Sequence, residues 1–218
     1  MTAVHVVWDW NGTLFDDLDV VVESVSRSIV RYGLEPIDAE EYRNHFTRPV
    51  RRFYDSLFGR PVSDMEWEDL NNTYHDLYHA SVHNARLAGD ARASLERVSE
   101  LGWTQSLLSM STHSELTKLV DQHGIRPFFR SVSGLSSANG DLKVNYLRRH
   151  LDNQNLKPEQ VIVVGDTPDD HAAAVEVGAR SVAFDGGSHH RQVLDDIGVP
   201  VVHTLLSAVD CIEIWVSS

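Results

Sequence analysis

The 218-residue sequence contains one cysteine, Cys211, and no long apolar run, and each scarcity excludes a class of protein. A lone cysteine forms neither an internal disulfide nor a cysteine-based metal cluster, which is typical of a chain in the reducing cytoplasm. No apolar stretch approaches the roughly 18 residues of a membrane span. The apolar run at 4–8 stops at Asp9, which predicts a strand and not a signal peptide. We therefore expect a cytoplasmic protein without a membrane partner.

Basic residues are also scarce, because 19 Lys and Arg stand against 32 Asp and Glu and give a formal net charge of −13. Nucleic acids are bound mainly by clustered Lys and Arg, so this charge argues against a nucleic-acid partner. A small phosphorylated molecule is compatible with it if the site itself concentrates cations. With 42% hydrophobic residues, the chain has the composition of an ordinary globular protein and is long enough to bury a full core.

Short β-branched runs alternate with amphipathic segments in the second half of the chain. Runs at 105–108, 161–164 and 181–184 are separated by segments of helical periodicity at 114–123 and 169–177. This alternation predicts an α/β fold, a Rossmann-like doubly wound parallel sheet with helices on both faces. Ligands of such sheets bind at the carboxyl ends of the strands.

A long segment near the N-terminus has helical signals that follow one another without a convincing strand. Apolar residues recur at helical spacing from 18 to 29 and stop at Gly33, a candidate for the end of a helix. Ser63 begins the pattern of a capping box ahead of a second long helix. The predicted domains are a core domain, 1–15 with 89–218, and a smaller all-helical cap domain, 16–88.

An acidic residue, Asp9, follows the first predicted strand directly. Gly12 and Thr13 come next, and they let the chain turn sharply and aim backbone N–H groups inward. Such a loop forms a cradle for an anion and a cation together. The alternative is an ordinary Asn-Gly turn after a strand.

A second acidic loop follows the apolar run at 161–164 and contains Asp166, Asp169 and Asp170. Crowded carboxylates repel one another, and a bound divalent cation is the usual way to neutralise them. Oxygen ligands of this kind suit Mg²⁺. The alternative is helix capping, because Asp169 and Asp170 also fit the first turn of a helix. One residue can serve both roles.

These loops, with two weaker signals between them, resemble the four motifs of the haloacid dehalogenase-like hydrolase superfamily. The resemblance covers nearly the whole chain, and the helical insert after the first motif is similar to that of the phosphoglycolate-phosphatase-like group. The motifs are Asp-x-Asp-Gly-Thr, a Ser or Thr that ends a strand, a lysine, and Gly-Asp-x-x-x-Asp. The matching positions are Asp9 with Gly12 and Thr13, Ser109 ahead of a capping-box pattern at 112–115, Lys143, and Gly165 with Asp166 and Asp170.

The resemblance implies a Mg²⁺-dependent phosphatase that forms an aspartyl-phosphate. Asp9 would be the nucleophile, and Lys143 would counter its charge and hold the phosphoryl group. The implied metal site consists of Asp9, the backbone carbonyl of Asn11, Asp166 and Asp170, the last either on the metal or behind it. The implied substrate-binding residues are Gly12, Thr13, Ser109, Met110 and Lys143.

The sequence departs from the first motif at Asn11, where the superfamily has the aspartate that protonates the leaving group. An amide orients a water but cannot shuttle a proton, and acid–base catalysis is typically worth about 10²–10⁴-fold. We therefore expect slow turnover, a stabilised phosphoenzyme, or another donor such as His171; the alternative for His171 is an exposed residue of a helix's first turn. His5, Asp16 and Asp17 are further titratable groups. Deamidation of the Asn-Gly sequence would also restore an aspartate.

Three features of the predicted cap and its surroundings bear on specificity. The run at 48–52 is the densest basic patch, and we predict Arg48 as a clamp for a substrate carboxylate or phosphate; the alternative is a solvated arginine paired with local acids. Trp67, Tyr74 and Tyr78 are spaced for one helix face and are predicted to form cap core. His189 and His190 lack a third spaced ligand and are interpreted as surface residues.

The leading functional prediction is hydrolysis of a small phosphorylated metabolite, with phosphoglycolate as the family's default. Two alternatives follow from Asn11: a phosphotransferase or mutase, and a phosphate-binding regulatory protein that has lost turnover. Dehalogenation is not expected, because halide displacement does not need a metal and phosphate site of this kind. We expect a monomer or a homodimer.

Overall fold

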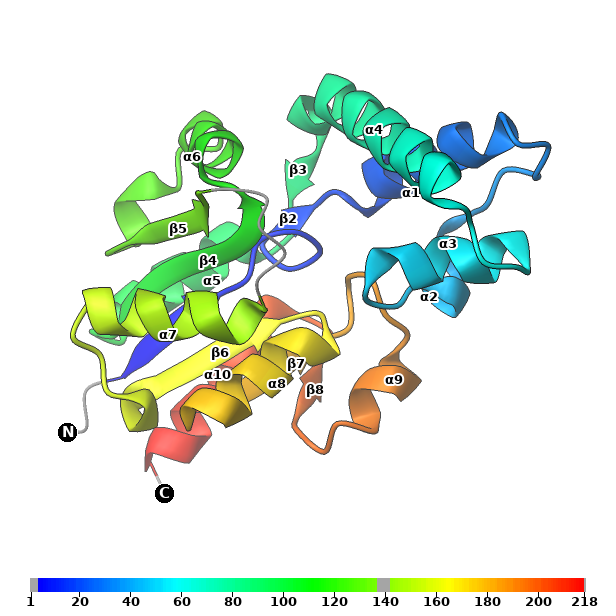
Figure 1. Ribbon diagram of the computed structural model, residues 1–218. Helices are drawn as coiled ribbons and strands as arrows, with labels where there is room; N and C mark the ends of the chain where they lie inside the picture. Colours follow the sequence, from blue (N-terminus) through cyan, green and yellow to red (C-terminus); the bar gives the residue numbers. More distant parts are fainter. Residues whose placement is uncertain (1–3, 137–141, 218) are drawn as a thin grey trace.

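A six-stranded parallel sheet forms the centre of the molecule (Figure 1). The computed structural model describes residues 4–136 and 142–217, so the remaining residues of the predicted core domain, 1–3, 137–141 and 218, lie outside the description. The spatial order of the strands is β5-β4-β1-β6-β7-β8. Their bounds are β1 His5–Trp8, β4 Thr104–Thr112, β5 Val132–Leu135, β6 Val161–Gly165, β7 Arg180–Phe184 and β8 Val201–Val202.

The strand order reverses at β1. The chain first builds β4 and β5 on one side of β1 and then β6, β7 and β8 on the other side. In a sheet of this topology, a crevice opens at the carboxyl ends of the strands where the order reverses, because the connecting loops diverge there. The loops after β1, β4 and β6 therefore meet at one edge of the sheet, and the predicted doubly wound parallel sheet is confirmed.

Helices cover both faces of the sheet, with α7 and α8 in front and α5 and α10 behind in Figure 1. Strand β1 contributes apolar side chains to the core on both faces of the sheet, since Val6 and Trp8 pack in one buried cluster and Val7 packs in the other. That alternation follows from the period of two of a β-strand. No described helix is long and apolar enough to cross a membrane. The helices of the core are α5 Ala91–Glu100, α6 His113–Gln122, α7 Lys143–Asn153, α8 Pro168–Val177, α9 Arg191–Asp195 and α10 Leu205–Ser217, with short 3-10 turns at Arg126–Phe128 and Pro158–Gln160.

A separate group of helices stands beyond the carboxyl ends of the strands and forms a cap (Figure 1). Its own apolar core includes Ile29, Phe53 and Leu70, all almost fully buried. Two short antiparallel strands, β2 (Phe15–Asp16) and β3 (Arg86–Leu87), pair where the chain enters and leaves this group. The helices of the cap are α1 Leu18–Val30, α2 Ala39–His45, α3 Val50–Phe58 and α4 Asp64–Ser81, followed by a 3-10 turn at Val82–Asn84.

The local helix signals had mixed outcomes. The capping box at Ser63 is confirmed, since its side chain accepts from the Glu66 N–H and the Glu66 carboxylate accepts from the Ser63 N–H. Helix α1 ends at Val30, before Gly33. The capping box predicted at Thr112 is wrong, because Thr112 is the last residue of β4 and makes no side-chain cap bond. Its intended partner, Glu115, instead binds His79 of the cap helix α4 at 2.5 Å.

Candidate active site

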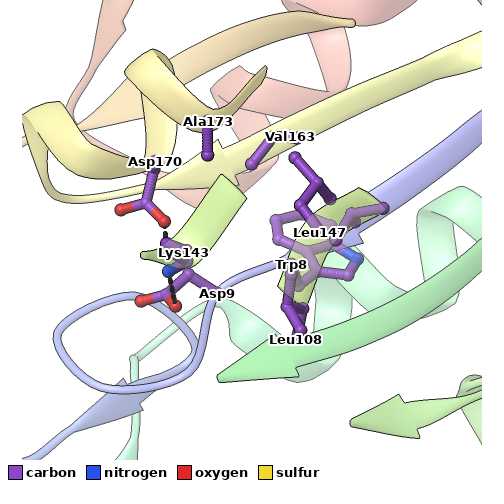
Figure 2. A pocket seen from close by; sticks show the side chains of 9 residues that line it. Trp8, Asp9, Leu108, Lys143, Leu147, Val163, Asp170 and Ala173 are labelled. Atoms are coloured by element: carbon purple, nitrogen blue, oxygen red, sulfur yellow. Dashed lines mark hydrogen bonds and ion pairs between the residues drawn. The ribbon is translucent and has the colours of Figure 1, made fainter. Parts of the chain in front are cut away.

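The charged residues of the first, third and fourth motifs meet at the carboxyl edge of the sheet. Asp9 follows β1, Asp166 follows β6, Asp170 lies in the first turn of α8, and Lys143 is the first residue of α7. The Lys143 ammonium forms ion pairs with both Asp9 and Asp170 and lies between them (Figure 2). Apolar side chains that include Leu108 and Leu147 line a cavity of about 10 Å³ beside them.

Three buried carboxylates gather around one lysine. One oxygen each from Asp9, Asp166 and Asp170 lie within 4.8 Å of one another, and the three side chains are 7%, 0% and 2% exposed. Burial raises the pKa of Asp9 to about 8; Lys143 lowers it, and the charges of Asp170 and Asp166 raise it further. Burial and Asp170 likewise raise the pKa of Asp166 to about 6. One lysine is too little positive charge for three ionised carboxylates.

The loops hold the Asp166 carboxylate by hydrogen bonds and by close packing. Its carboxylate accepts from the Thr13 hydroxyl at 3.1 Å and from the Ser188 N–H at 2.8 Å. A Cβ at Gly12 or at Gly187 would collide with the same carboxylate, and Gly12 also has a left-handed backbone with φ of 70°. Only glycine fits this close approach. The three buried oxygen donors with unbalanced negative charge therefore suit a hard divalent cation.

The hydrogen bonds of the loop after β1 are used inside the protein. The Gly12 N–H donates to the Phe15 carbonyl at 2.9 Å and to Asp17 Oδ1 at 3.1 Å, so it does not point toward a bound anion. The Thr13 side chain binds Asp166. Both residues of the predicted phosphate cradle thus shape the loop and its metal ligand in this structure.

Asn11 is the hub of a network that links the sheet to the cap. Its Nδ2 donates to Asp17 Oδ2 at 2.7 Å and to the Tyr78 hydroxyl at 2.8 Å. Its Oδ1 accepts from the Ser111 hydroxyl at 2.7 Å and from the Ser109 hydroxyl at 3.5 Å. Both N–H groups of the amide therefore face the cap, and its oxygen faces the serines at the end of β4.

Asp17 carries a buried carboxylate whose partners in the described chain include no cation. It is 2% exposed and accepts from Asn11, from the Gly12 N–H and from the Tyr78 hydroxyl at 2.6 Å. Burial raises its pKa, and the bonds from Tyr78, Asn11 and Gly12 oppose that shift. Burial and Asp17 together raise the pKa of Tyr78 above its usual range. The sequence analysis interpreted Tyr78 as packing only, because helix periodicity has no signal for a hydroxyl partner that lies 61 positions away in sequence.

The second motif lies inside a strand that is longer than predicted. Strand β4 continues to Thr112, and its pairing with β5 shifts register between Leu108 and Thr112. Ser109 is buried at this irregularity, and its hydroxyl also accepts from the Ser111 N–H at 3.0 Å. Met110 is half-buried beside it. Ser109 and Ser111 both donate to the same amide oxygen, Oδ1 of Asn11.

Arg48 lies at a contact between the cap and the core. Its guanidinium pairs with Asp169 at 3.2 Å, and both side chains are about half exposed, 47% and 49%. Asp169 is next to Asp170, so Arg48 approaches the acidic cluster from the cap side. Arg43 of α2 makes a second such contact by donating to the Gly187 carbonyl at 2.9 Å. The pairing of Arg48 with an acid agrees with the alternative interpretation of this residue.

The histidines singled out in the sequence lie outside this network. His171 is bound to the Ser181 hydroxyl of β7 at 2.7 Å, and burial lowers its pKa. His190 precedes α9 and binds Asn44 of the cap at 3.1 Å. The interpretation of His189 as a surface residue is wrong, because it is 9% exposed and packs on Phe46 with ring centroids 5.2 Å apart. Contact with Phe46 of the cap therefore covers the His189 side chain.

The chain is similar to known proteins over nearly its full length. The family model of haloacid dehalogenase-like hydrolases matches residues 6–184. A phosphoglycolate phosphatase of Aliivibrio fischeri is 26% identical, with 90% of each chain covered, and that of Vibrio parahaemolyticus is 25% identical, with 85% of each covered. A haloacid dehalogenase-like family hydrolase of Streptococcus pneumoniae superposes with a TM-score of 0.81 at 22% identity, over 97% of this chain and 99% of that one. The chain therefore belongs to the haloacid dehalogenase-like hydrolases and, among them, to the phosphoglycolate-phosphatase-like group of phosphatases.

Proposed function

We propose that this protein is a Mg²⁺-dependent phosphatase that hydrolyses a small phosphorylated metabolite through an aspartyl-phosphate on Asp9. The observation that carries the proposal is the buried cluster of Asp9, Asp166 and Asp170 around Lys143 at the carboxyl edge of the sheet. Family membership and the phosphoglycolate phosphatases among the relatives support it. These relatives make 2-phosphoglycolate the first compound to test.

Asp9 would act as the nucleophile. One of its oxygens forms a bond to phosphorus, and the bond from phosphorus to the leaving-group oxygen breaks, with the electron pair leaving on that oxygen. Water then attacks the phosphorus of the aspartyl-phosphate and releases inorganic phosphate and free Asp9. Two displacements replace one difficult displacement by water.

Asp9, Asp166 and Asp170 would hold Mg²⁺, with the Asn11 carbonyl as the further ligand implied by the family resemblance. The cation supplies positive charge that reduces the repulsion between an anionic nucleophile and an anionic phosphoryl group. Lys143 adds a second positive charge to the same place, and it orients Asp9 through their ion pair. Ser109 is buried within β4, near its carboxyl end, and is suited to bind a phosphoryl oxygen.

Phosphate release tests this proposal. We would measure it with and without Mg²⁺ from a panel of phosphorylated metabolites that includes 2-phosphoglycolate, for the wild type, Asp9→Asn and a control, Asp152→Asn, an exposed residue in the last turn of α7. We expect Mg²⁺-dependent release that Asp9→Asn abolishes and Asp152→Asn preserves. Release that survives Asp9→Asn contradicts the mechanism.

Two further candidates are a phosphotransferase and a phosphate-binding regulatory protein. The Asn11 amide favours them over a fast phosphatase, because both of its N–H groups and its oxygen are already hydrogen-bonded within the protein. Trapping of the phosphoenzyme separates the two. A stable aspartyl-phosphate on Asp9 without phosphate release indicates transfer to another acceptor. Ligand binding without a phosphoenzyme indicates a binding protein.

A further inference from the structure

The orientation of the Asn11 amide determines what the site can offer to a leaving group. A carboxylate only accepts hydrogen bonds, and the Asp17 carboxylate lies 2.7 Å from one end of the amide. That end must be the NH₂ group, because a carbonyl oxygen there would repel Asp17. Tyr78 enforces the same orientation, since its hydroxyl donates to Asp17 and so presents only its oxygen to Asn11.

The amide has no hydrogen left for the substrate. Its two N–H groups are taken by Asp17 and Tyr78, and its oxygen faces Ser109 and Ser111, which is the side where the phosphoryl group would bind. Asn11 therefore presents an acceptor there, suited to orient a water for the second displacement. It gives the departing oxygen of the first displacement neither a proton nor a hydrogen bond.

The neighbours of Asn11 do not supply that proton. Each group that faces Asp17 donates to it, so Asp17 acts as an acceptor in all of these bonds. Lys143 is held between Asp9 and Asp170. Among the residues that the structure describes, the hydrogen-bond partners of the Asn11 side chain on the substrate side are two serine hydroxyls.

We propose that the substrate is a phosphoryl compound whose leaving group departs as a weakly basic anion, such as a phosphoanhydride, an acyl phosphate or an aryl phosphate, in preference to the phosphate ester of an alkyl alcohol. The phosphorus–oxygen bond breaks as the bond to Asp9 forms, the departing oxygen keeps the electron pair, and any proton it needs comes from solvent. This inference rests on the proposed phosphatase activity and narrows its substrate. It makes 2-phosphoglycolate, an alkyl phosphate, a poor substrate.

A series of substituted phenyl phosphates tests the inference, because its members differ in leaving-group basicity and hardly in shape. We would measure kcat/KM, which reports the first displacement, from 4-nitrophenyl phosphate to unsubstituted phenyl phosphate. We expect kcat/KM to fall by about 100-fold or more across the series, the size of the missing acid catalysis. A fall of less than about tenfold overturns the inference, since it indicates that some group protonates the leaving oxygen.

A double variant, Asn11→Asp with Asp17→Asn, exchanges the amide and the carboxyl group and keeps the charge and composition constant. It restores a carboxyl group where the family has its acid, so we expect the fall across the series to shrink to within about tenfold. An unchanged steep dependence in a folded double variant contradicts the role assigned to Asn11. If the double variant does not fold, the single variant Asn11→Asp is measured in its place. The control is Tyr32→Phe, which removes a cap hydroxyl that binds Asp69 away from this network.

The outcomes separate this inference from the proposed function. If 4-nitrophenyl phosphate releases no phosphate and labels no phosphoenzyme, the phosphatase proposal fails and the inference with it. If every phenyl phosphate is hydrolysed at a similar rate in a metal-dependent way that needs Asp9, the phosphatase proposal survives and the inference alone fails.

Discussion

The Tyr78 hydroxyl joins the cap to the loop of the nucleophile, and its removal should destabilise the protein well beyond the loss of a typical surface hydrogen bond. The hydroxyl donates to the buried Asp17 carboxylate at 2.6 Å and accepts from Asn11 at 2.8 Å. A hydrogen bond to a charged group is worth about 1.5–3 kcal/mol, and removal leaves an Asn11 N–H without its acceptor. We expect Tyr78→Phe to lower the free energy of unfolding by about 2–3 kcal/mol.

Thermal unfolding measures this loss against a matched control. At about 2–4 °C per kcal/mol for a chain of this size, Tyr78→Phe should lower Tm by about 5–10 °C. Tyr32→Phe removes a hydroxyl of the same cap that bonds Asp69 at 2.8 Å, and the Asp69 side chain is 42% exposed. We expect that control to cost about 1 kcal/mol or less, because water replaces an exposed partner.

The pH dependence of the loss gives a second check. Burial raises the pKa of Asp17, and the bond from Tyr78 opposes that shift, so the pKa rises further in Tyr78→Phe. A carboxyl group whose pKa is higher in the folded state than in the unfolded state costs stability once it ionises. The difference in Tm between variant and wild type should therefore be larger at pH 8 than at pH 5. Equal losses for Tyr78→Phe and Tyr32→Phe, at either pH, refute the reasoning.

Three further predictions concern other parts of the molecule. Burial lowers the pKa of His5 to about 3 and that of His150 to about 4. The unfolded chain therefore binds more protons, and the free energy of unfolding should decrease as the pH falls below about 6.5. Urea unfolding between pH 7 and pH 5 should show this decrease, and the decrease should be smaller in His150→Gln. Gly187→Ala places a Cβ against the Asp166 carboxylate, so we expect Mg²⁺ affinity to fall by about 10–100-fold in calorimetry, whereas Gly89→Ala, with nothing within 4 Å, should leave it unchanged. Deamidation of Asn11 requires attack by the Gly12 backbone nitrogen, whose N–H donates to two acceptors in the fold. Peptide mass mapping should therefore find slower deamidation in the native protein than in urea. Equal rates of deamidation in the two conditions would contradict this prediction.

Local sequence patterns were sufficient to predict the sheet and the edge of the sheet at which the candidate site lies. The run at 161–164 is fully apolar, as a strand that is buried on both faces requires, and β6 ends at Gly165, directly before Asp166. Asp9 is placed in the same way by β1. Both placements depend on residues adjacent in sequence, so composition and order determine them. The carboxyl ends of parallel strands then meet by geometry alone.

Contacts between the cap and the core could not be predicted in this way. Glu115 has the spacing of a capping box with Thr112, but His79 of another helix binds it instead. His189 resembles a surface residue until Phe46 of the cap covers it. The direction of the Asn11 amide depends on Tyr78, which is 67 positions away in sequence. Each of these outcomes depends on which side chain a folded neighbour presents.

The paired strands β2 and β3 bring the two ends of the helical insert side by side, with Phe15 opposite Leu87 and Asp16 opposite Arg86. An insert attached this way can be exchanged during evolution or by a protein engineer without cutting the sheet. Asp17 and Tyr78 limit that freedom, because one begins the insert, the other lies near its end, and both bind Asn11 of the core. A transplanted cap would have to bring both residues or be matched to a different side chain at position 11. The cap and the nucleophile loop of this chain are therefore one unit for any such exchange.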